Sequence, residues 1–165
     1  MIKRMIKNIL QIIFTAIVKK NCYRYANGLR VNFYSKVNKN TILGNNVNMN
    51  GLEISGNGQV IIGDNFHCGR NCLLITQNHN YNGTKIPYDE TYITKEIMIE
   101  DNVWFGHNVI IIGSFKIGEG AIIQAGAVVV KDVEPLSIVG GNPAKAFSQR
   151  DSEHYYRLKQ EKRFH

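Results

Sequence analysis

The sequence predicts an all-β solenoid, in which one short strand and one tight corner repeat along the chain. Two observations predict this class. Apolar side chains recur every six residues over most of the chain, and no long helical pattern occurs between Val31 and Ala146. A helical face recurs about every 3.6 residues and a strand face about every two, so a period of six suits neither element alone.

The repeat is clearest in the C-terminal half, where a lead series of apolar side chains is followed by a second series at an offset of four. The lead residues are expected to point into a narrow prism, while the offset residues fill its corners. Glycine or asparagine takes the unusual dihedral angles of each corner, as at Gly106 and Gly118. The lead series is Ile99, Phe105, Ile111, Ile117, Ile123 and Val129, and the offset series is Val103, Val109, Phe115, Ala121, Ala127, Val133 and Val139.

The same phase continues upstream, which sets the extent of the predicted domain. The earlier positions are Ile62, Cys68 and Leu74 with Phe66 and Cys72 at the offset, and more weakly Val37, Leu43 and Met49. The step from Met49 to Ile62 is thirteen residues, which indicates one inserted residue. At 165 residues the chain suits one domain. We predict an N-terminal helix and lead-in over residues 1–30, the solenoid over 31–147, and a basic helical tail over 148–165.

Composition restricts the partners. The net charge is +7, which favours anionic partners such as nucleic acid, acidic lipid or a phosphorylated molecule such as coenzyme A. No aromatic-rich basic face or known module indicates nucleic-acid binding. The three cysteines show neither a disulfide framework nor zinc spacing, and Cys68 and Cys72 fall on inward positions. We expect a cytoplasmic protein.

Residues 1–20 are predicted to form a basic amphipathic helix. Isoleucines at positions 2, 6, 9, 13 and 17 share one helical face, and the apolar run from Ile9 to Val18 is too short to span a bilayer. Lys19 and Lys20 stand where a cleaved signal would have small residues. One interpretation is a helix that caps the solenoid with its apolar face. The other is a helix that rests on an anionic membrane, at its inner face.

A polar excursion leaves the solenoid over about residues 76–96. Leu74 and Ile99 are 25 residues apart, so the repeat loses its phase between them. The excursion carries His79, which is flanked by Asn78 and, two residues on, Tyr81. Long excursions from rigid scaffolds are more often functional than accidental, so we expect the chemistry here.

The segment from Asn102 to Phe147 resembles the carboxy-terminal coils of hexapeptide-repeat acetyltransferases. It is most similar to the branch that contains galactoside, maltose and xenobiotic acetyltransferases and many O-antigen and capsule acetyltransferases. The similarity covers about Val31 to Phe147, and the GNPAK run is its most specific part. The resemblance implies a left-handed parallel β-helix, a homotrimer with active sites between neighbouring chains, acetyl-CoA as the donor, and no metal.

The resemblance also implies a general base. In the family a histidine of the protruding loop deprotonates the acceptor, and its counterpart by position is His79, about twenty residues ahead of the VWFG segment. Histidine suits this role because its unperturbed pKa lies near neutrality. His107 is the competitor. The family commonly has a small residue there, whose main chain approaches the cofactor, and the His107 backbone can serve the same purpose.

Further contacts are implied by position. Trp104 resembles the aromatic residue that lines the acetyl-CoA pocket, although it could equally pack at a trimer contact. Ala125 matches a small residue whose amide meets the pantetheine arm, and Lys131 and Lys145 match basic residues near the 3′-phosphate. The chain departs from the family at Val130, where threonine is frequent, and at Gly113, where proline is frequent. The candidate acceptor contacts are Asn50, Asn78 and Tyr81.

The predicted function is therefore transfer of an acetyl group from acetyl-CoA to a hydroxyl of a sugar or glycan precursor, in surface polysaccharide biosynthesis. The alternative is N-acetylation of an amino sugar, free or nucleotide-linked, with the same base and donor. Two remoter alternatives are a non-catalytic solenoid and a γ-type carbonic anhydrase. The latter needs three histidines around a metal, whereas the excursion contains one.

Overall fold

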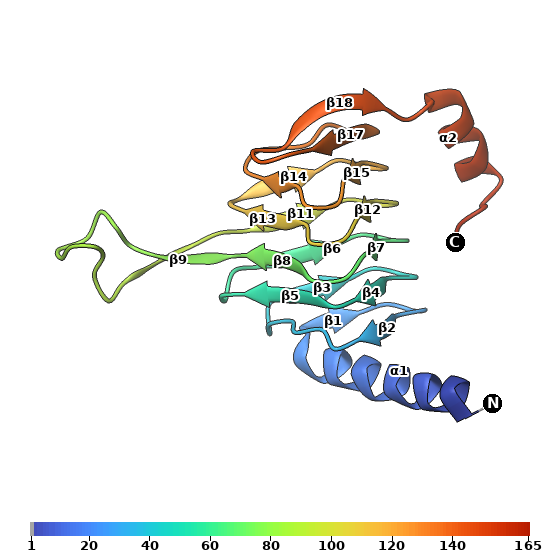
Figure 1. Cartoon of the computed structure of the whole chain (residues 1–165), viewed down its shortest axis with the longest axis horizontal. Coiled ribbons are helices and arrows are strands. Elements are labelled where there is room, and N and C mark those ends of the chain that lie inside the picture. Colours follow the sequence, from blue (N-terminus) through green and yellow to red (C-terminus); the bar gives the residue numbers. More distant parts are fainter. Residues whose placement is uncertain (1) are drawn as a thin grey trace.

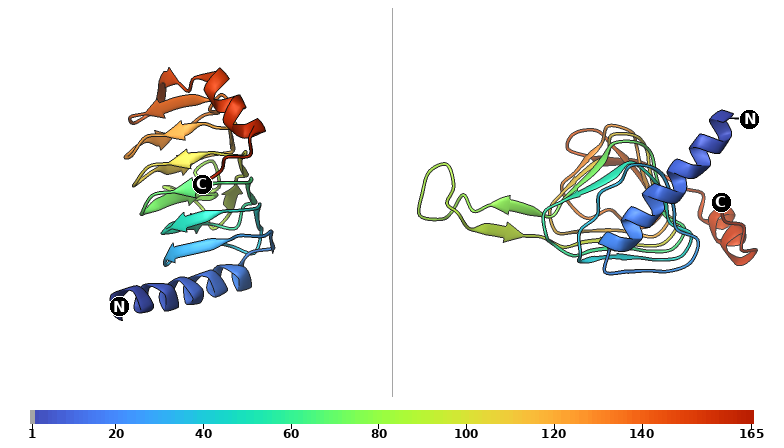
Figure 2. Two further views of the ribbon diagram at one scale, coloured as in Figure 1. Left: turned by 90° about the vertical axis from the view of Figure 1, so that its right-hand side faces the viewer. Right: turned by 90° about the horizontal axis from the view of Figure 1, so that it is seen from below.

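A computed structural model describes residues 2–165 and shows a column of stacked coils with one helix at each end of the chain (Figure 1). Helix α1 (Ile2–Asn21) lies across the lower end, and α2 (Ser152–Gln160) lies beside the upper part of the column. Viewed along the column, the coils trace a triangle, and a long arm leaves one of its corners (Figure 2). This is the predicted left-handed parallel β-helix of hexapeptide repeats.

Short parallel strands form the three walls of the triangle. The five-stranded wall contains β1 (Arg24–Tyr25), β3 (Thr41–Leu43), β6 (Val60–Ile62), β11 (Ile97–Ile99) and β14 (Phe115–Ile117). The four-stranded wall contains β5 (Leu52–Ser55), β8 (Cys72–Ile75), β13 (Ile110–Ile112) and β16 (Val128–Val129). The seven-stranded wall contains β2 (Arg30–Phe33), β4 (Asn48–Asn50), β7 (His67–Cys68), β12 (Trp104–Phe105), β15 (Ile122–Ile123), β17 (Ser137–Gly140) and β18 (Lys145–Gln149).

The strand register stacks lead residue on lead residue, as the repeat requires. Ile99 pairs with Ile117, Phe105 with Ile123 and Ile111 with Val129. Every lead residue is at most 8 % exposed, and the offset residues are buried as well. The exception is Phe115, which is half-buried and packs against the edge of the core. The predicted aliphatic column is confirmed, with the Phe66 and Phe105 rings meeting edge to face at 5.1 Å.

Asparagines hold the corner between the five- and seven-stranded walls. Asn46, Asn65 and Asn102 adopt φ values of 53°, 56° and 60°, a region that asparagine tolerates better than other side chains with a Cβ. Their amides form a ladder, with Nδ2 of Asn46 donating to Oδ1 of Asn65 at 3.0 Å and Nδ2 of Asn65 donating to Oδ1 of Asn102 at 2.9 Å. The ladder satisfies polar groups that a tight corner would otherwise leave unpaired.

The irregular step divides into five and eight residues, so β5 comes one residue early and the corner after it is longer. Ile54 is the missing inward residue, five positions after Met49 and eight before Ile62, and it pairs with Leu74. The long corner over 55–59 bulges below the point where the arm leaves the column. Thr76 Oγ1 accepts a hydrogen bond from Gly58 N at 3.2 Å, and Gln77 Oε1 accepts one from Asn57 N at 3.2 Å. The insertion therefore braces the base of the arm.

Helix α1 contacts the column through a narrow side that combines apolar Phe14 and Val18 with polar Gln11 and Thr15. Val18 is fully buried, Gln11 Nε2 donates to Asn32 Oδ1 at 2.6 Å, and Thr15 Oγ1 accepts from Val31 N at 3.1 Å. Ile9 and Ile13 are instead 49 % and 46 % exposed. The expectation that α1 caps the column with its apolar face is wrong, because that face points away from the coils. Within residues 2–165, no helix has the length and apolar character needed to cross a membrane.

The chain ends with a reversal of strand direction. β18 runs antiparallel to β17 and extends to Gln149, two residues past the predicted domain boundary. Helix α2 then begins at the Asp151 cap, whose side chain accepts a hydrogen bond from His154 N at 2.8 Å. Tyr155 of α2 reaches back to the asparagine ladder, where its hydroxyl accepts from Asn102 Nδ2 at 2.9 Å and donates to Glu119 at 2.8 Å.

Candidate functional site

The polar excursion forms a β-hairpin arm. β9 (Gln77–His79) and β10 (Tyr92–Thr94) pair antiparallel, with His79 opposite Tyr92 and Asn78 opposite Ile93. The arm projects well clear of the column and ends in a compact tip (Figures 1 and 2). The buried carboxylate of Asp89 organises this tip by accepting hydrogen bonds from Thr84 N at 3.0 Å and Thr91 N at 2.9 Å. Hydrogen bonds from Thr91 and Thr84 lower the pKa of Asp89, which keeps its carboxylate ionised.

His79 lies at the end of β9 with an exposed ring. The ring stacks on Tyr88 with centroids 4.0 Å apart and an interplanar angle of 17°, and it lies 4.8 Å from the Tyr92 ring. Two aromatic rings from the other side of the arm thus limit the orientations of the imidazole while its edge stays open to solvent. The spacing of these tyrosines in the sequence does not show that their rings meet the histidine.

The arm places the predicted acceptor contacts differently. Asn78 lies in β9, where Lys95 Nζ is 3.1 Å from its amide, and Tyr81 is 67 % exposed near the tip. Asn50 lies far away on the seven-stranded wall. Its amide already donates to Cys68 O at 2.7 Å and accepts from Asn32 Nδ2 at 2.9 Å. Asn50 therefore belongs to a second side-chain ladder, and its role toward an acceptor stays a prediction.

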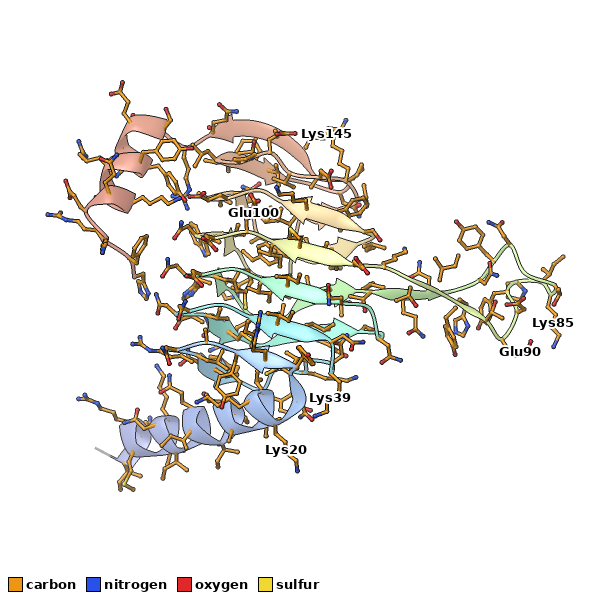
Figure 3. All side chains as sticks on the ribbon, turned by 180° about the vertical axis from the view of Figure 1, so that it is seen from behind. Lys20, Lys39, Lys85, Glu90, Glu100 and Lys145 are labelled. Carbon is orange, nitrogen blue, oxygen red and sulfur yellow. The ribbon has the colours of Figure 1, made fainter. Side chains whose placement is uncertain are left out.

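One edge of the column, where the seven-stranded and four-stranded walls meet, carries three of the predicted cofactor residues, namely His107, Ala125 and Lys145. Gly106, beside His107, stacks on Ala125 so closely that a Cβ there would lie 2.6 Å from Ala125 N. Gly126 N donates to His107 O, and Lys145 pairs with Gly140 one coil further on. Figure 3 shows Lys145 at the upper end of the column, far from Lys85 and Glu90 at the arm tip.

The His107 ring has a partner that the sequence did not reveal. Arg70 N donates a hydrogen bond to His107 Nδ1 at 3.0 Å. Because Nδ1 accepts this bond, the neutral ring carries its proton on Nε2 and presents a donor to solvent. A general base needs a free lone pair directed at the acceptor, so this arrangement favours His79 over His107.

The remaining predicted residues lie on two other edges. Trp104, on the outer face of β12, is 49 % exposed and pairs with Ile122 and His67. It lines a groove of about 570 Å³ between α2 and the seven-stranded wall, together with His67, Arg150, Tyr155 and Lys159. Lys131 is exposed and follows β16, on the arm side of the column. No sequence pattern indicated this groove, because α2 closes it only by folding back on the column.

One chain therefore does not bring the predicted residues together. His79 lies on the arm, whereas Trp104 faces the groove beside α2, on the opposite side of the column (Figure 1). Within residues 2–165, no three His, Cys, Asp or Glu side chains are grouped as metal ligands would be. The cofactor residues lie on rigid coils and the histidine on a projecting arm.

The repeats themselves match a known family model. The model, described as bacterial transferase hexapeptide with six repeats, matches residues 96–131. This stretch contains the lead residues from Ile99 to Val129 and the corner residues His107 and Ala125. This part of the column therefore carries the hexapeptide repeat that the family model describes.

Curated relatives of the chain carry acetyltransferase names. A Schizosaccharomyces pombe protein named as an acetyltransferase is 38 % identical over 94 residues, which cover 57 % of this chain and 45 % of the relative. A chloramphenicol acetyltransferase of Escherichia coli is 50 % identical over 58 residues, which cover 35 % and 28 %. The chain matches less than half the length of each relative.

Solved structures share the column over most of its length. A Vibrio cholerae hexapeptide-repeat acetyltransferase, complexed with acetyl coenzyme A, superposes with a TM-score of 0.67 and 27 % identity, covering 82 % of this chain and 76 % of the other. A galactoside acetyltransferase in complex with coenzyme A gives a TM-score of 0.70 at 22 % identity, covering 93 % and 83 %. At 22 % identity this likeness concerns the fold alone.

Proposed function

We propose that this protein transfers an acetyl group from acetyl-CoA to a hydroxyl of a sugar or glycan precursor used in surface polysaccharide synthesis. The observation that carries the proposal is the exposed imidazole of His79, which two tyrosine rings orient on an arm of a hexapeptide-repeat transferase. The acetyltransferase names of relatives and the acetyl coenzyme A complex of the Vibrio cholerae structure support the donor.

The chemistry is a direct transfer. The acceptor oxygen attacks the thioester carbonyl while His79 removes the hydroxyl proton, and the new C–O bond forms as the C–S bond breaks. The sulfur of coenzyme A leaves as a thiolate and takes this proton from the histidinium, which restores the neutral imidazole. Backbone N–H groups of the rigid coil stabilise the oxyanion, because they need no reorganisation when its charge develops.

The cofactor residues suit the parts of a long, anionic donor. The edge formed by Gly106 and Ala125 has little side-chain bulk, so a pantetheine arm can approach the main chain at Ala125 and His107. Lys145 on the same edge and Lys131 offer cations to the 3′-phosphate. Trp104 offers an exposed apolar ring.

A homotrimer completes the site. The arm leaves its own column and carries Ile86, which is fully exposed, at its tip. An exposed isoleucine on a projecting arm is suited to contact another chain. In a trimer of side-by-side columns, the arm of one chain meets the cofactor edge of its neighbour, which brings His79 to residues that it does not approach within one chain. We place the reaction in the cytoplasm, where acetyl-CoA is available.

The test is a screen of the purified full chain with acetyl-CoA against hydroxy sugars and amino sugars, free and lipid-linked. Release of coenzyme A is followed with a thiol reagent, and the product is identified by mass and by its stability to mild base. An alkali-labile ester on a sugar supports the proposal. A stable amide would assign N-acetylation instead. Failure to bind acetyl-CoA in a direct titration would remove the donor assignment and leave a non-catalytic solenoid.

A further inference from the structure

The outer side of α1 is an apolar surface that the column does not cover. Val18, Thr15 and Gln11 mark the side of the helix that faces β2. With about 100° between successive helical residues, Ile9 and Ile13 lie on the side opposite these contacts. The outward side carries seven large apolar side chains that are between 41 % and 69 % exposed, namely Ile2, Met5, Ile6, Ile9, Leu10, Ile12 and Ile13.

The position of the helix makes this side the end surface of the molecule. In Figure 1 and in both views of Figure 2, α1 lies across the lower end of the column. Its apolar side therefore faces along the column axis, away from every coil. Monomeric proteins rarely expose a contiguous apolar surface of this kind, and such surfaces mark sites of interaction.

Positive charge lies on the polar side of the first turns of α1 and at its C-terminal end. Lys3, Arg4 and Lys7 lie near its first turns, Lys19 and Lys20 lie at its end, and α1 contains no acidic residue. Figure 3 shows Lys20 at the end of α1 with Lys39 of the first coil close by, and Lys39 Nζ donates to Lys20 O at 2.6 Å. We call α1 together with the exposed Arg24, Arg30 and Lys39 the basal face.

Positive charge is also concentrated in the N-terminal part of the whole chain. Nine lysines and arginines precede the first acidic residue, Glu53, whereas the rest of the chain has eleven lysines and arginines against thirteen acidic residues. The net charge of +7 thus comes entirely from the end of the column that carries α1. A helix that combines a broad apolar side with flanking cations binds in the plane of a membrane surface.

We propose that the basal face docks the protein on an anionic lipid bilayer, with α1 lying flat in the interface and the column standing upright on it. Insertion of the isoleucines provides the apolar burial, and the cations attract the lipid headgroups. A second copy is the poorer occupant. Two basal faces in contact would oppose eight cations to eight cations without an acidic residue on either face.

Docking would also set the height of the site. The arm leaves the column at mid-height and runs roughly parallel to the end surface on which α1 lies (Figure 1). The upright orientation holds His79 at a fixed distance from the membrane surface. Under the proposed function, on which this point rests, that distance suits an acceptor whose sugar is attached to a lipid. The vesicle experiment below requires no acetyl transfer, so it tests docking independently of catalysis.

The experiment is co-sedimentation of the full chain with vesicles of phosphatidylcholine alone and of phosphatidylcholine with about one-third phosphatidylglycerol. We expect binding to the anionic vesicles, at least tenfold weaker binding to the neutral ones, and a marked loss of binding as salt rises from about 0.05 to 0.5 M. The double variant Ile9→Glu, Ile13→Glu should lower affinity on the order of a hundredfold. Its unfolding midpoint should stay unchanged because both side chains point to solvent.

A charge-matched pair of variants separates the basal face from general attraction. The triple variant Lys3→Gln, Arg4→Gln, Lys7→Gln should weaken binding on the order of a hundredfold, since each cation near an anionic surface contributes roughly fivefold. The control Arg157→Gln, Lys162→Gln, Arg163→Gln removes the same charge from the C-terminal tail and should change affinity less than about twofold. Equal losses in both triple variants, or no binding of the wild type, overturn the proposal. A halved assembly mass of the isoleucine variant without lipid would show that the face binds a second copy instead.

Discussion

The two candidate histidines differ in what occupies their ring atoms. His107 Nδ1 accepts a hydrogen bond from Arg70 N, whereas the His79 ring packs on two tyrosine rings and, within residues 2–165, neither of its nitrogens forms a hydrogen bond. Sequence position pointed to His79 through a resemblance, and the bonding of the two rings gives an independent physical reason for the same choice. A nitrogen already committed to a backbone N–H cannot take a proton without breaking that bond.

The residue-scale prediction follows from this difference. His79→Ala should lower kcat about 10²–10⁴-fold, the usual contribution of a positioned general base. Binding of acetyl-CoA should hardly change, because the ring faces the acceptor, and the acidic limb of the pH–rate profile should disappear. Steady-state kinetics and donor titration measure these effects.

His107→Ala is the matched control. It should cost far less activity, because the His107 backbone and not its ring is assigned to the donor. Loss of turnover in His107→Ala with most activity kept in His79→Ala would reverse the assignment. Full activity in both variants would mean that the base is not a histidine.

At the scale of elements, the arm and the two helices depart most from the column's repeat. The arm was expected to be a loop, and it is a hairpin because β9 and β10 pair and Asp89 fixes the tip. Helix α2 is tied to the column by Tyr155, whose hydroxyl lies between Asn102 and Glu119, and by the ion pair of Lys159 with Glu119. Burial alone would raise the pKa of Glu119, but the bonds from Lys159 and Tyr155 outweigh it and hold this pKa below its ordinary value.

The element-scale prediction concerns the pH at which α2 detaches. A carboxyl whose pKa is depressed in the folded state contributes stability that is fully present above its ordinary pKa of 4.5 and is lost as pH falls through the lower folded value. Amide hydrogen exchange in α2 should therefore accelerate on acidification before the coils lose protection. Glu119→Gln should exchange faster at neutral pH and lose this acid dependence. An α2 whose protection tracks that of the coils at every pH would contradict the prediction.

At the scale of the whole molecule, one chain carries all the parts of the proposed site but does not assemble them. The column is rigid and the arm projects away from it, so no movement of side chains alone can bring His79 to Trp104 (Figure 1). Assembly of chains is the simplest way to complete the site. It would also let the exposed Ile86 at the arm tip pack against a neighbouring chain.

The prediction at this scale is a homotrimer. Light scattering at micromolar concentration should give three times the chain mass. Ile86→Asp should shift the protein toward smaller species and lower activity in parallel, because it places a charge where the arm meets its neighbour. Ile61, in β6 of the column, offers a contrasting position, and Ile61→Val should leave the mass unchanged. A wild-type monomer with full activity would refute the two-chain site.

The sequence by itself determined the column. A period of six places one inward side chain on each wall, and this local pattern is sufficient because each coil only repeats the contacts of the coil below it. Lead residues from Val37 to Val129, the inserted residue before Ile62 and the place where the arm leaves were all predicted from the periodicity. The position of His79 followed from the resemblance.

Only the tertiary structure decided how the elements outside the repeat are placed. The side of α1 that meets the coils, the stacking of His79 on Tyr88, the bond from Arg70 to His107 and the groove beneath α2 all join residues without a shared period. The amphipathic pattern of α1 shows that one face is apolar, but the pattern is the same whether that face meets protein, lipid or water. Which face docks depends on the few polar bonds that the end of the column offers, namely those of Asn32 and Val31. These bonds exist only once the coils have folded.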